Sequence, residues 1–305
     1  MTTLTEGAFA KVNLTLDVLG KREDGFHDLK SVMQTITLHD DVMITLDTGC
    51  GWALHCFREI LPEREEDDDT PPESEFVTDG LPQDAENIAW KAAQVYFARI
   101  GKEPDGIEVC INKRIPSQAG LGGGSADAAA VLHALNRHYG APLSLPALAE
   151  LGAQIGSDVP FCVLGGTAMV EGRGERLTKL PCEAELYYVV CKPDFGISTA
   201  ELYKAIDAQV ITNRPDHNSM LVNLQKGDFL GIGGSMCNVF EPIVMQDHFD
   251  INYIKSVMFT YGAYGAQMTG SGSAVFGIFD SFEYATVACT MLKDKYSSIY
   301  LATTV

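Results

Sequence analysis

Residues 116–125 read Pro-Ser-Gln-Ala-Gly-Leu-Gly-Gly-Gly-Ser, and an alanine-rich segment follows them directly. Glycine lets a backbone turn tightly and approach a ligand closely. A helix that begins behind such a turn presents free N–H groups, which bind phosphate without basic side chains. The stretch therefore predicts a phosphate-binding loop that opens a helix, with the hydroxyl of Ser125 in reach of a phosphate or its magnesium ion. The alternative is a plain flexible turn. Four glycines within five residues, directly before an alanine-rich segment, count against that alternative.

The familiar nucleotide-binding patterns do not describe this loop. It lacks the Gly-Lys-Ser/Thr ending of the ordinary P-loop, and the spacing of its glycines is not that of the dinucleotide-binding fingerprint. The loop therefore indicates a phosphate site of another kind.

The chain has 305 residues and a formal net charge of −19, which counts against a nucleic-acid-binding protein. No run approaches the roughly 20 apolar residues that a membrane span needs. The N-terminus lacks the basic and apolar regions of a signal peptide. The eight cysteines include no Cys-x-x-Cys pair, so we expect no zinc site. These features predict a cytoplasmic protein with free thiols, bound neither to membranes nor to nucleic acid.

Apolar and polar residues alternate from 8 to 18. This period of two is typical of a half-buried strand, which would place Lys11, Asn13 and Thr15 together on one face. By contrast, residues 63–75 are strongly acidic and contain two prolines, so we expect a solvated loop there.

The remaining pattern predicts an α+β protein of two domains, because helices and strands do not alternate regularly. Each domain is expected to hold a mixed or antiparallel sheet packed with helices. Helices are predicted at 86–100, 126–139, 144–155, 199–208 and 282–293. Strands are predicted within 32–46 and at 107–111, 186–191 and 299–303, with a strand, glycine turn and strand at 265–277.

Two residues outside the loop are candidates for catalysis. Asp158 lies in a glycine- and serine-containing turn before Val-Pro-Phe, where a partly desolvated carboxylate could accept a proton from a hydroxyl. Taken alone, it fits an aspartate that caps a helix or closes a turn better than it fits a base. Lys11, taken alone, fits the solvent face of a strand. The glycine turn at Gly270, Ser271 and Gly272 is either a simple hairpin or a wall near the phosphates.

Together these pieces resemble the GHMP superfamily of small-molecule kinases, whose three motifs occur here in order over nearly the whole chain. Within it, the chain is similar to the branch of 4-diphosphocytidyl-2-C-methyl-D-erythritol kinases. The segments that carry the resemblance are 10–14 (Ala-Lys-Val-Asn-Leu), 24–27 (Asp-Gly-Phe-His), 120–125 (Gly-Leu-Gly-Gly-Gly-Ser), 156–161 (Gly-Ser-Asp-Val-Pro-Phe), 192–193 (Lys-Pro), 198–200 (Ser-Thr-Ala) and 268–272 (Met-Thr-Gly-Ser-Gly). The second segment discriminates best, because other branches lack it.

The resemblance implies a role for each matching residue. Asp158 would be the general base and Lys11 its charged partner at the reacting hydroxyl. His27 would contact the edge of cytosine, Phe26 would stack on one face of the ring, and Tyr203 on the other. Substrate would also be bound by Asn13, near the phosphates, and by Thr199. ATP would be bound by Pro116, Gly120, Leu121, Gly122, Gly123, Gly124 and Ser125, with Asn87 and Lys113 near adenine.

The implied reaction transfers the γ-phosphoryl group of ATP to the C2 hydroxyl of the methylerythritol unit, with Mg²⁺ bridging phosphates near Ser125. The implied fold places the active-site cleft between an N-terminal domain at 1–180, which holds the phosphate loop, and a C-terminal domain at 181–305. The protein would be a monomer or a homodimer. Alternatives are a homoserine- or mevalonate-type kinase of the superfamily, or a nucleotide-binding protein without catalysis.

The chain departs from the family pattern at two places. Phe26 stands where tyrosine is usual, so the aromatic face is kept and the hydroxyl is lost. The acidic stretch at 63–75 looks like an insertion, which affects the local loop geometry rather than the chemistry.

Overall fold

The structure is a computed structural model that describes residues 1–60, 75–78, 80–83, 85–182 and 184–305. The acidic stretch at 63–75 lies outside these residues, apart from Glu75. The strands are β1 (Thr2–Lys21), β2 (His27–Leu46), β3 (Trp52–Ile60), β4 (Glu75–Val77), β5 (Ile107–Asn112), β6 (Thr167–Gly172), β7 (Arg176–Lys179), β8 (Tyr187–Lys192), β9 (Cys237–Asn238), β10 (Gly265–Met268), β11 (Val275–Phe279) and β12 (Ser298–Thr303). The helices are α1 (Ile88–Ile100), α2 (Gly123–His138), α3 (Leu145–Gly152), α4 (Val159–Leu164), α5 (Thr199–Asp207), α6 (His217–Lys226), α7 (Phe229–Ser235), α8 (Glu241–Val244), α9 (Asp250–Thr260) and α10 (Phe282–Lys293).

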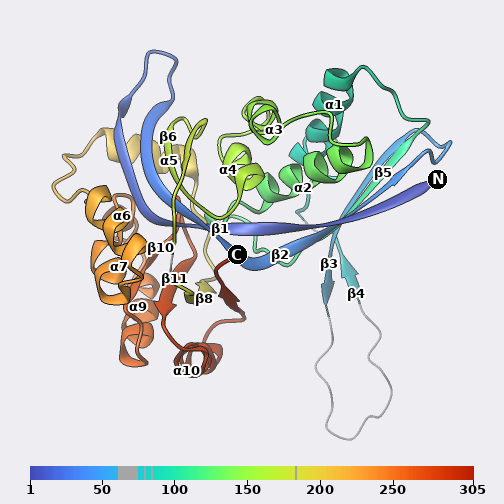
Figure 1. Cartoon of the computed structure of the whole chain (residues 1–305). Coiled ribbons are helices and arrows are strands. Elements are labelled where there is room, and N and C mark those ends of the chain that lie inside the picture. Colours follow the sequence, from blue (N-terminus) through green and yellow to red (C-terminus); the bar gives the residue numbers. More distant parts are fainter. Residues whose placement is uncertain (61–74, 79, 84, 183) are drawn as a thin grey trace, which may run out of the picture.

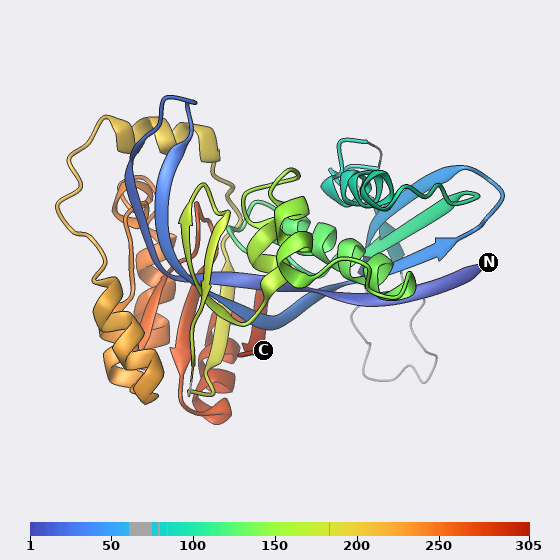
Figure 2. The ribbon, with the colours of Figure 1, turned by 45° about the horizontal axis from the view of Figure 1, so that its top comes forward.

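Two long antiparallel strands, β1 and β2, run through the molecule and belong to both of its halves (Figure 1). They form the centre of a mixed sheet in the order β4-β3-β5-β2-β1-β9, to which β6 and β7 are added beside β2. The second sheet, β10-β11-β8-β12, is antiparallel throughout. Figure 2 shows α1–α4 gathered on one side of the long strands, and α6–α10 around the second sheet. The predicted α+β architecture with two sheets is confirmed.

The strand predicted at 8–18 exists as part of β1, but the prediction that one of its faces meets solvent is wrong. Lys11, Asn13 and Thr15 are as deeply buried as the apolar residues between them. The apolar face packs on α2 within the first hydrophobic core. The polar face is covered by the C-terminal half, because Asn13 N–H donates to the hydroxyl of Thr269 and Thr15 is hydrogen-bonded to His217 of α6. A period of two in the sequence identifies the strand, but it does not say whether either face of that strand is exposed to water.

Most predicted elements match the described ones, with shifts at their ends. The helix at 282–293 has the predicted bounds, and α1 ends at Gly101 in the left-handed conformation, as expected for a glycine stop. The helix predicted from 126 begins three residues earlier, so the last glycines of the loop form its first turn. The prediction omitted strands β3, β4, β6, β7 and β9 and helices α4 and α6–α9. The eight cysteines are free, and of these three are buried, four are half-buried and Cys50 is exposed.

A buried group of three charges anchors the phosphate loop to the first sheet. Lys113, just after β5, donates to carboxylate oxygens of Asp40 on β2 and Asp127 on α2. The other oxygen of Asp40 accepts the backbone N–H groups of Arg114 and Ile115, at 2.5 and 2.7 Å. Burial raises the pKa of Asp127 well above its usual range. Both ends of the loop are thereby tied to one ammonium group.

We expect Lys113→Met to lower the free energy of unfolding by about 3–5 kcal/mol, because it leaves two buried carboxylates without their counter-charge. Chemical denaturation at pH 7 measures the loss. The matched control is Lys91→Met on the exposed face of α1, which should change stability by less than about 0.5 kcal/mol. A similar small change in both variants would show that the buried group does not anchor the loop.

Candidate active site

Two joined cavities lie where the loop before α2 meets the C-terminal half. The larger has a volume of about 770 Å³ and the smaller about 310 Å³. They share the lining residues Gly120, Gly122, Thr199 and Ser271. The larger is lined by residues of β1, β2, α5 and the turn before α4, and the smaller by the loop at 115–124. A ligand bound along the loop would therefore reach a second ligand in the larger cavity.

The predicted phosphate loop forms the wall of the smaller cavity. Gly120 and Gly122 have φ values of +72° and +71°, which side chains rarely adopt. Gly122 is the N-cap of α2 and supplies no side-chain cap. The first N–H groups of this helix are therefore available to a ligand, and the helix dipole favours an anion there. Ser125, in the same first turn, lines the larger cavity.

Lys11 and Asp158 meet in the larger cavity, although they lie far apart in the sequence. Lys11 Nζ lies 3.5 Å from Oδ2 of Asp158, and 4% of the lysine side chain is exposed against 32% of the aspartate side chain. Asp158 occupies the N-cap position of α4, but its carboxylate makes no capping hydrogen bond. The carboxylate therefore caps no helix and lines the larger cavity, and its role as a base stays a prediction.

Asn13 orients Lys11 and joins it to the C-terminal half. Its Oδ1 accepts a hydrogen bond from Lys11 Nζ at 2.7 Å, and its Nδ2 donates to Ser31 Oγ at 2.8 Å. The hydroxyl of Thr269 is 3.3 Å from both Asn13 Oδ1 and the carbonyl oxygen of Gly120. A single hydroxyl therefore links β1, the phosphate loop and the glycine turn. That turn is a wall of the site and not a simple hairpin.

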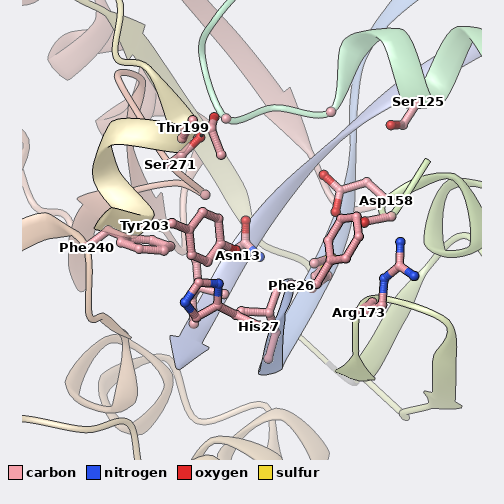
Figure 3. Close-up of a pocket in the computed structure, with 18 of the residues that line it drawn as sticks. Asn13, Phe26, His27, Ser125, Asp158, Arg173, Thr199, Tyr203, Phe240 and Ser271 are labelled. Carbon is pink, nitrogen blue, oxygen red and sulfur yellow. Dashed lines mark hydrogen bonds between the residues drawn. The ribbon is translucent and has the colours of Figure 1, made fainter. Parts of the chain in front are cut away.

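Phe26 and Asp158 both line the larger cavity (Figure 3). Phe26 is half exposed, and one face of its ring is covered by the guanidinium of Arg173, whose Cζ lies 3.7 Å from the ring centre. Arg173 comes from the turn between β6 and β7. An aromatic ring between a cation and open space can stack a second planar group on its free face.

His27 is held from two sides. Its Nε2 lies 2.7 Å from Oδ1 of Asp207 at the end of α5, and its ring stacks on Tyr203 with centroids 4.6 Å apart. The hydrogen bond from His27 lowers the pKa of Asp207, which also pairs with Lys21. Because an ionised carboxylate only accepts hydrogen bonds, Nε2 carries the proton. Tyr203 thus supports His27, and its role as a second stacking face stays a prediction.

The structure brings most of the predicted residues to the two cavities. The loop residues from Pro116 to Gly124 line the smaller cavity, and Thr199 Oγ1 lies 3.0 Å from Ser271 Oγ at the junction. Asn87 lines neither cavity; its side chain caps α1 by accepting the N–H of Ala89. Lys113 lines the smaller cavity, but its ammonium is engaged by Asp40 and Asp127.

Arg173, Asp207 and Phe240 are among the residues of the site that sequence reasoning missed. Arg173 lies between two glycines with positive φ, Gly172 and Gly174, and a cation in such a turn is a signal that could have been noticed. Asp207 and Phe240 carry no such signal, because an aspartate at a helix end and a phenylalanine in an apolar segment are ordinary. Figure 3 shows Phe240 beside Tyr203, with ring centroids 5.1 Å apart.

The described residues contain no group of three or more His, Cys, Asp or Glu side chains that could hold a metal ion. Ser125, in the first turn of α2, lines the larger cavity and offers a hydroxyl to a magnesium ion. Mg²⁺ often takes only one or two protein ligands and completes its shell with phosphates and water. The residues fit a magnesium ion that arrives with a nucleotide. In the part of the chain that is described, no helix has the length and apolar character for crossing a bilayer.

Comparisons with known proteins agree with this geometry. The profile of the GHMP kinases N terminal domain matches residues 87–166, and that of the GHMP kinases C terminal domain matches residues 220–298. A 4-diphosphocytidyl-2-C-methyl-D-erythritol kinase of Caldicellulosiruptor saccharolyticus is 40% identical over 300 residues, covering 97% of this chain and 95% of the relative. The corresponding kinase of Clostridium tetani is 38% identical, covering 98% and 99%.

Solved structures show the same fold. The crystal structure of a 4-(cytidine 5'-diphospho)-2C-methyl-D-erythritol kinase matches with a TM-score of 0.77 and 30% identity over 98% of both chains. A homoserine kinase from Cytophaga hutchinsonii matches with a TM-score of 0.75 and 21% identity, covering 100% of this chain and 95% of that one. The second likeness concerns the fold alone.

We expect Gly120→Ala to disrupt the site, because the added Cβ would lie 2.1 Å from the carbonyl oxygen of Thr269. Gly140→Ala is the matched control: its φ is +81°, and an added Cβ meets nothing within 4 Å. Both variants should lose about 1–2 kcal/mol from the left-handed backbone. Only Gly120→Ala should also weaken binding of an ATP analogue, by about tenfold or more. Calorimetric titration and thermal unfolding separate the two effects. Equal binding by both variants would show that the close approach is unimportant.

Proposed function

The chain belongs to the GHMP kinases, in the branch of the 4-diphosphocytidyl-2-C-methyl-D-erythritol kinases, and from this premise we propose that it phosphorylates the C2 hydroxyl of the methylerythritol unit with ATP. It is a phosphotransferase with an alcohol group as acceptor, acting in the non-mevalonate synthesis of isoprenoid precursors. The observation that supports this most strongly is the Lys11–Asp158 pair beside the junction of the two cavities.

The two cavities suit two different parts of the reaction. ATP would bind with its phosphates along residues 120–125, where backbone N–H groups and the dipole of α2 favour anions. The acceptor would occupy the larger cavity, with its hydroxyl beside Asp158. Asp158 accepts the proton of that hydroxyl, the alcohol oxygen forms a bond to the γ-phosphorus, and the bond to ADP breaks. Lys11 offers positive charge where the transferred group carries negative charge.

Magnesium would enter with the ATP phosphates and be held on the protein side by the hydroxyl of Ser125. A bound magnesium ion would neutralise part of the negative charge of the phosphates. The chain's own residues position the reactants, since phosphoryl transfer depends chiefly on alignment and charge stabilisation. We keep as proposals the adenine contacts of Asn87 and Lys113, a cytoplasmic location, and the division into domains at 180/181.

The cytidine group of the acceptor would lie between the hairpin that joins β1 to β2 and helix α5. Phe26 presents a free ring face there, and His27 stands beside it with its Nε2 turned to Asp207. The Nδ1 of His27 is then the nitrogen left to contact the edge of the base. A homoserine or mevalonate acceptor would leave these groups unused, so assays of all three acceptors distinguish this function from its alternatives.

We expect Asp158→Asn to fold normally and to lose about 100- to 10,000-fold in kcat, because a correctly placed base contributes that much. Lys11→Met should lose a similar factor, and the double variant should lose little more, since the two residues act as a unit. Steady-state assays with the cytidine substrate measure this. Asp105→Asn, on the exposed connection before β5, is the control and should keep wild-type turnover. Asp158→Asn retaining more than roughly a third of kcat would exclude it as the base.

We expect His27→Ala to weaken use of the cytidine substrate strongly while the affinity for ATP stays nearly unchanged, because the polar edge of the base loses its partner. Phe26→Ala should lose roughly 1–3 kcal/mol of binding to the same substrate from lost stacking. Separate titrations with the cytidine substrate and an ATP analogue measure both. The matched control is the Phe9–His39 pair elsewhere on the first sheet, whose centroids are 5.2 Å apart. Phe9→Ala and His39→Ala should bind both ligands normally; equal losses for both ligands in the His27 variant would contradict the assignment.

A further inference from the structure

The segment Asn238-Val239-Phe240-Glu241 is buried against the glycine turn of the site, although neither its asparagine nor its glutamate lines a cavity. The exposed fractions of Asn238 and Glu241 are 4% and 9%. A buried amide and a buried carboxylate are costly unless each polar atom finds a partner. Their partners therefore show what the segment does.

Both side chains bond to the backbone of the turn. The Nδ2 group of Asn238 donates to the carbonyl oxygens of Met268 and Gly270, at 2.8 and 2.9 Å. Its Oδ1 accepts the N–H of Phe240 at 3.0 Å. The carboxylate of Glu241 accepts the N–H of Met268 at 2.6 Å, and its other oxygen pairs with a lysine of α9. Three hydrogen bonds from one segment thus fix the entry to the turn.

The segment is itself fixed to the strand that carries Lys11. Strand β9 pairs in parallel with β1, where Asn238 stands opposite Leu16, and the N–H of Val239 donates to the carbonyl oxygen of Leu16 at 3.1 Å. Asn238 therefore connects the turn to β1 through a rigid backbone ladder. The turn's position relative to Lys11 is set by this connection together with the hydroxyl of Thr269.

The held turn stands between the two cavities. Gly270 and Ser271 line the larger cavity, and Ser271 and Gly272 line the smaller. An added Cβ at Gly270 would lie 3.3 Å from Lys11 Nζ. On its far side the turn bonds to the phosphate loop, because the N–H groups of Ser273 and Ala274 donate to carbonyl oxygens of residues 118 and 119. A shift of the turn would move the loop and the lysine relative to each other.

We propose that Asn238 and Glu241 are positioning residues for phosphoryl transfer, which hold the turn at 268–272 so that the phosphate loop and Lys11 are aligned across the junction of the two cavities. They touch neither substrate and act through the turn. The kinetic part of this inference rests on the proposed function, because alignment is read out as turnover. A misplacement of about 1 Å in such a site can cost on the order of 100-fold in rate.

The side chain of Asn238 suits this task in a way that near-isosteres do not. Its NH₂ group supplies two donors to two carbonyl oxygens, while its oxygen accepts a third bond. An aspartate of the same shape has no donor when ionised and would set its charge against both carbonyls. Asn238→Asp therefore changes the bonding without changing the volume, and Asn238→Ala removes the bonds without adding charge.

The experiment compares Asn238→Asp and Asn238→Ala with the matched control Asn136→Asp. Asn136 is also buried, and its amide bonds to both backbone groups of Leu143, at 2.9 and 3.1 Å, away from the cavities. All three variants should lose stability in thermal unfolding. The Asn238 variants should in addition lose about 10- to 100-fold in kcat, with the KM for each substrate within about threefold. The control should keep kcat within about twofold.

Glu241→Ala removes one of the three hydrogen bonds between the segment and the turn. This variant tests the proposal if the Asn238 variants do not fold. It should show the same pattern with a smaller loss of kcat, whereas Glu241→Gln retains an acceptor for Met268 and should restore most of it. A loss of kcat in Asn136→Asp equal to that of the Asn238 variants would overturn the proposal. The proposal would also be overturned if the Asn238 and Glu241 variants lost stability without losing kcat, or if they changed only KM.

Amide hydrogen exchange gives a second readout that does not depend on the substrate. Peptides covering 265–275 should exchange faster in the Asn238 variants than in the wild type, and should be unchanged in Asn136→Asp. Unchanged exchange in the Asn238 variants would refute the proposal whatever the activity. If the wild type fails to phosphorylate the cytidine substrate, the proposed function is wrong, and the exchange experiment still decides whether Asn238 holds the turn.

Discussion

The site depends on one close approach, that of the phosphate loop to the glycine turn of the C-terminal half. The carbonyl oxygen of Thr269 occupies the place where a Cβ of Gly120 would stand, and the hydroxyl of the same threonine contacts Asn13 and the loop. Only glycine at 120 allows this distance, and its φ of +72° is one that side chains rarely adopt. Three segments far apart in the sequence meet there, so the two halves can share one reaction centre.

Electrostatics explains how a chain with a net charge of −19 can hold two polyphosphate ligands. The larger cavity is lined by the cations Lys11, Lys21, Arg173 and Lys204 against the carboxylates of Asp158 and Asp207. The smaller cavity is lined by Lys113, whose ammonium group forms ion pairs with two buried aspartates. Phosphates there must rely on the N–H groups and dipole of α2. In the proposed arrangement the acceptor would meet side-chain charge and ATP would meet backbone dipoles, so that neither would require a basic protein.

Local pattern was sufficient to predict the glycine loop that opens a helix and the α+β architecture with two sheets. The short motifs of the family predicted that Lys11 and Asp158 lie together. The sequence was not sufficient where long-range contacts decide. The polar face of β1 looks solvent-exposed until the C-terminal half covers Asn13 and Thr15. The sequence likewise does not show that the ammonium of Lys113 pairs with Asp40, which lies 73 positions away. The start of α2 was placed too late, because glycines disfavour helix interiors by propensity and yet suit a first turn that faces a ligand.

Substrate recognition and chemistry are mechanically joined on the acceptor side. Arg173, which covers one face of Phe26, lies on the turn between β6 and β7, and its backbone N–H donates to Glu175 at 2.6 Å. In the same turn, an added Cβ at Gly174 would lie 2.1 Å from the carbonyl oxygen of Ser157, the residue before Asp158. The turn that supports the aromatic ring is therefore packed directly on the loop that carries the carboxylate. In the proposed function, binding energy gained at the ring would help to hold the carboxylate in place, which is how remote contacts assist a reaction at the other end of a substrate.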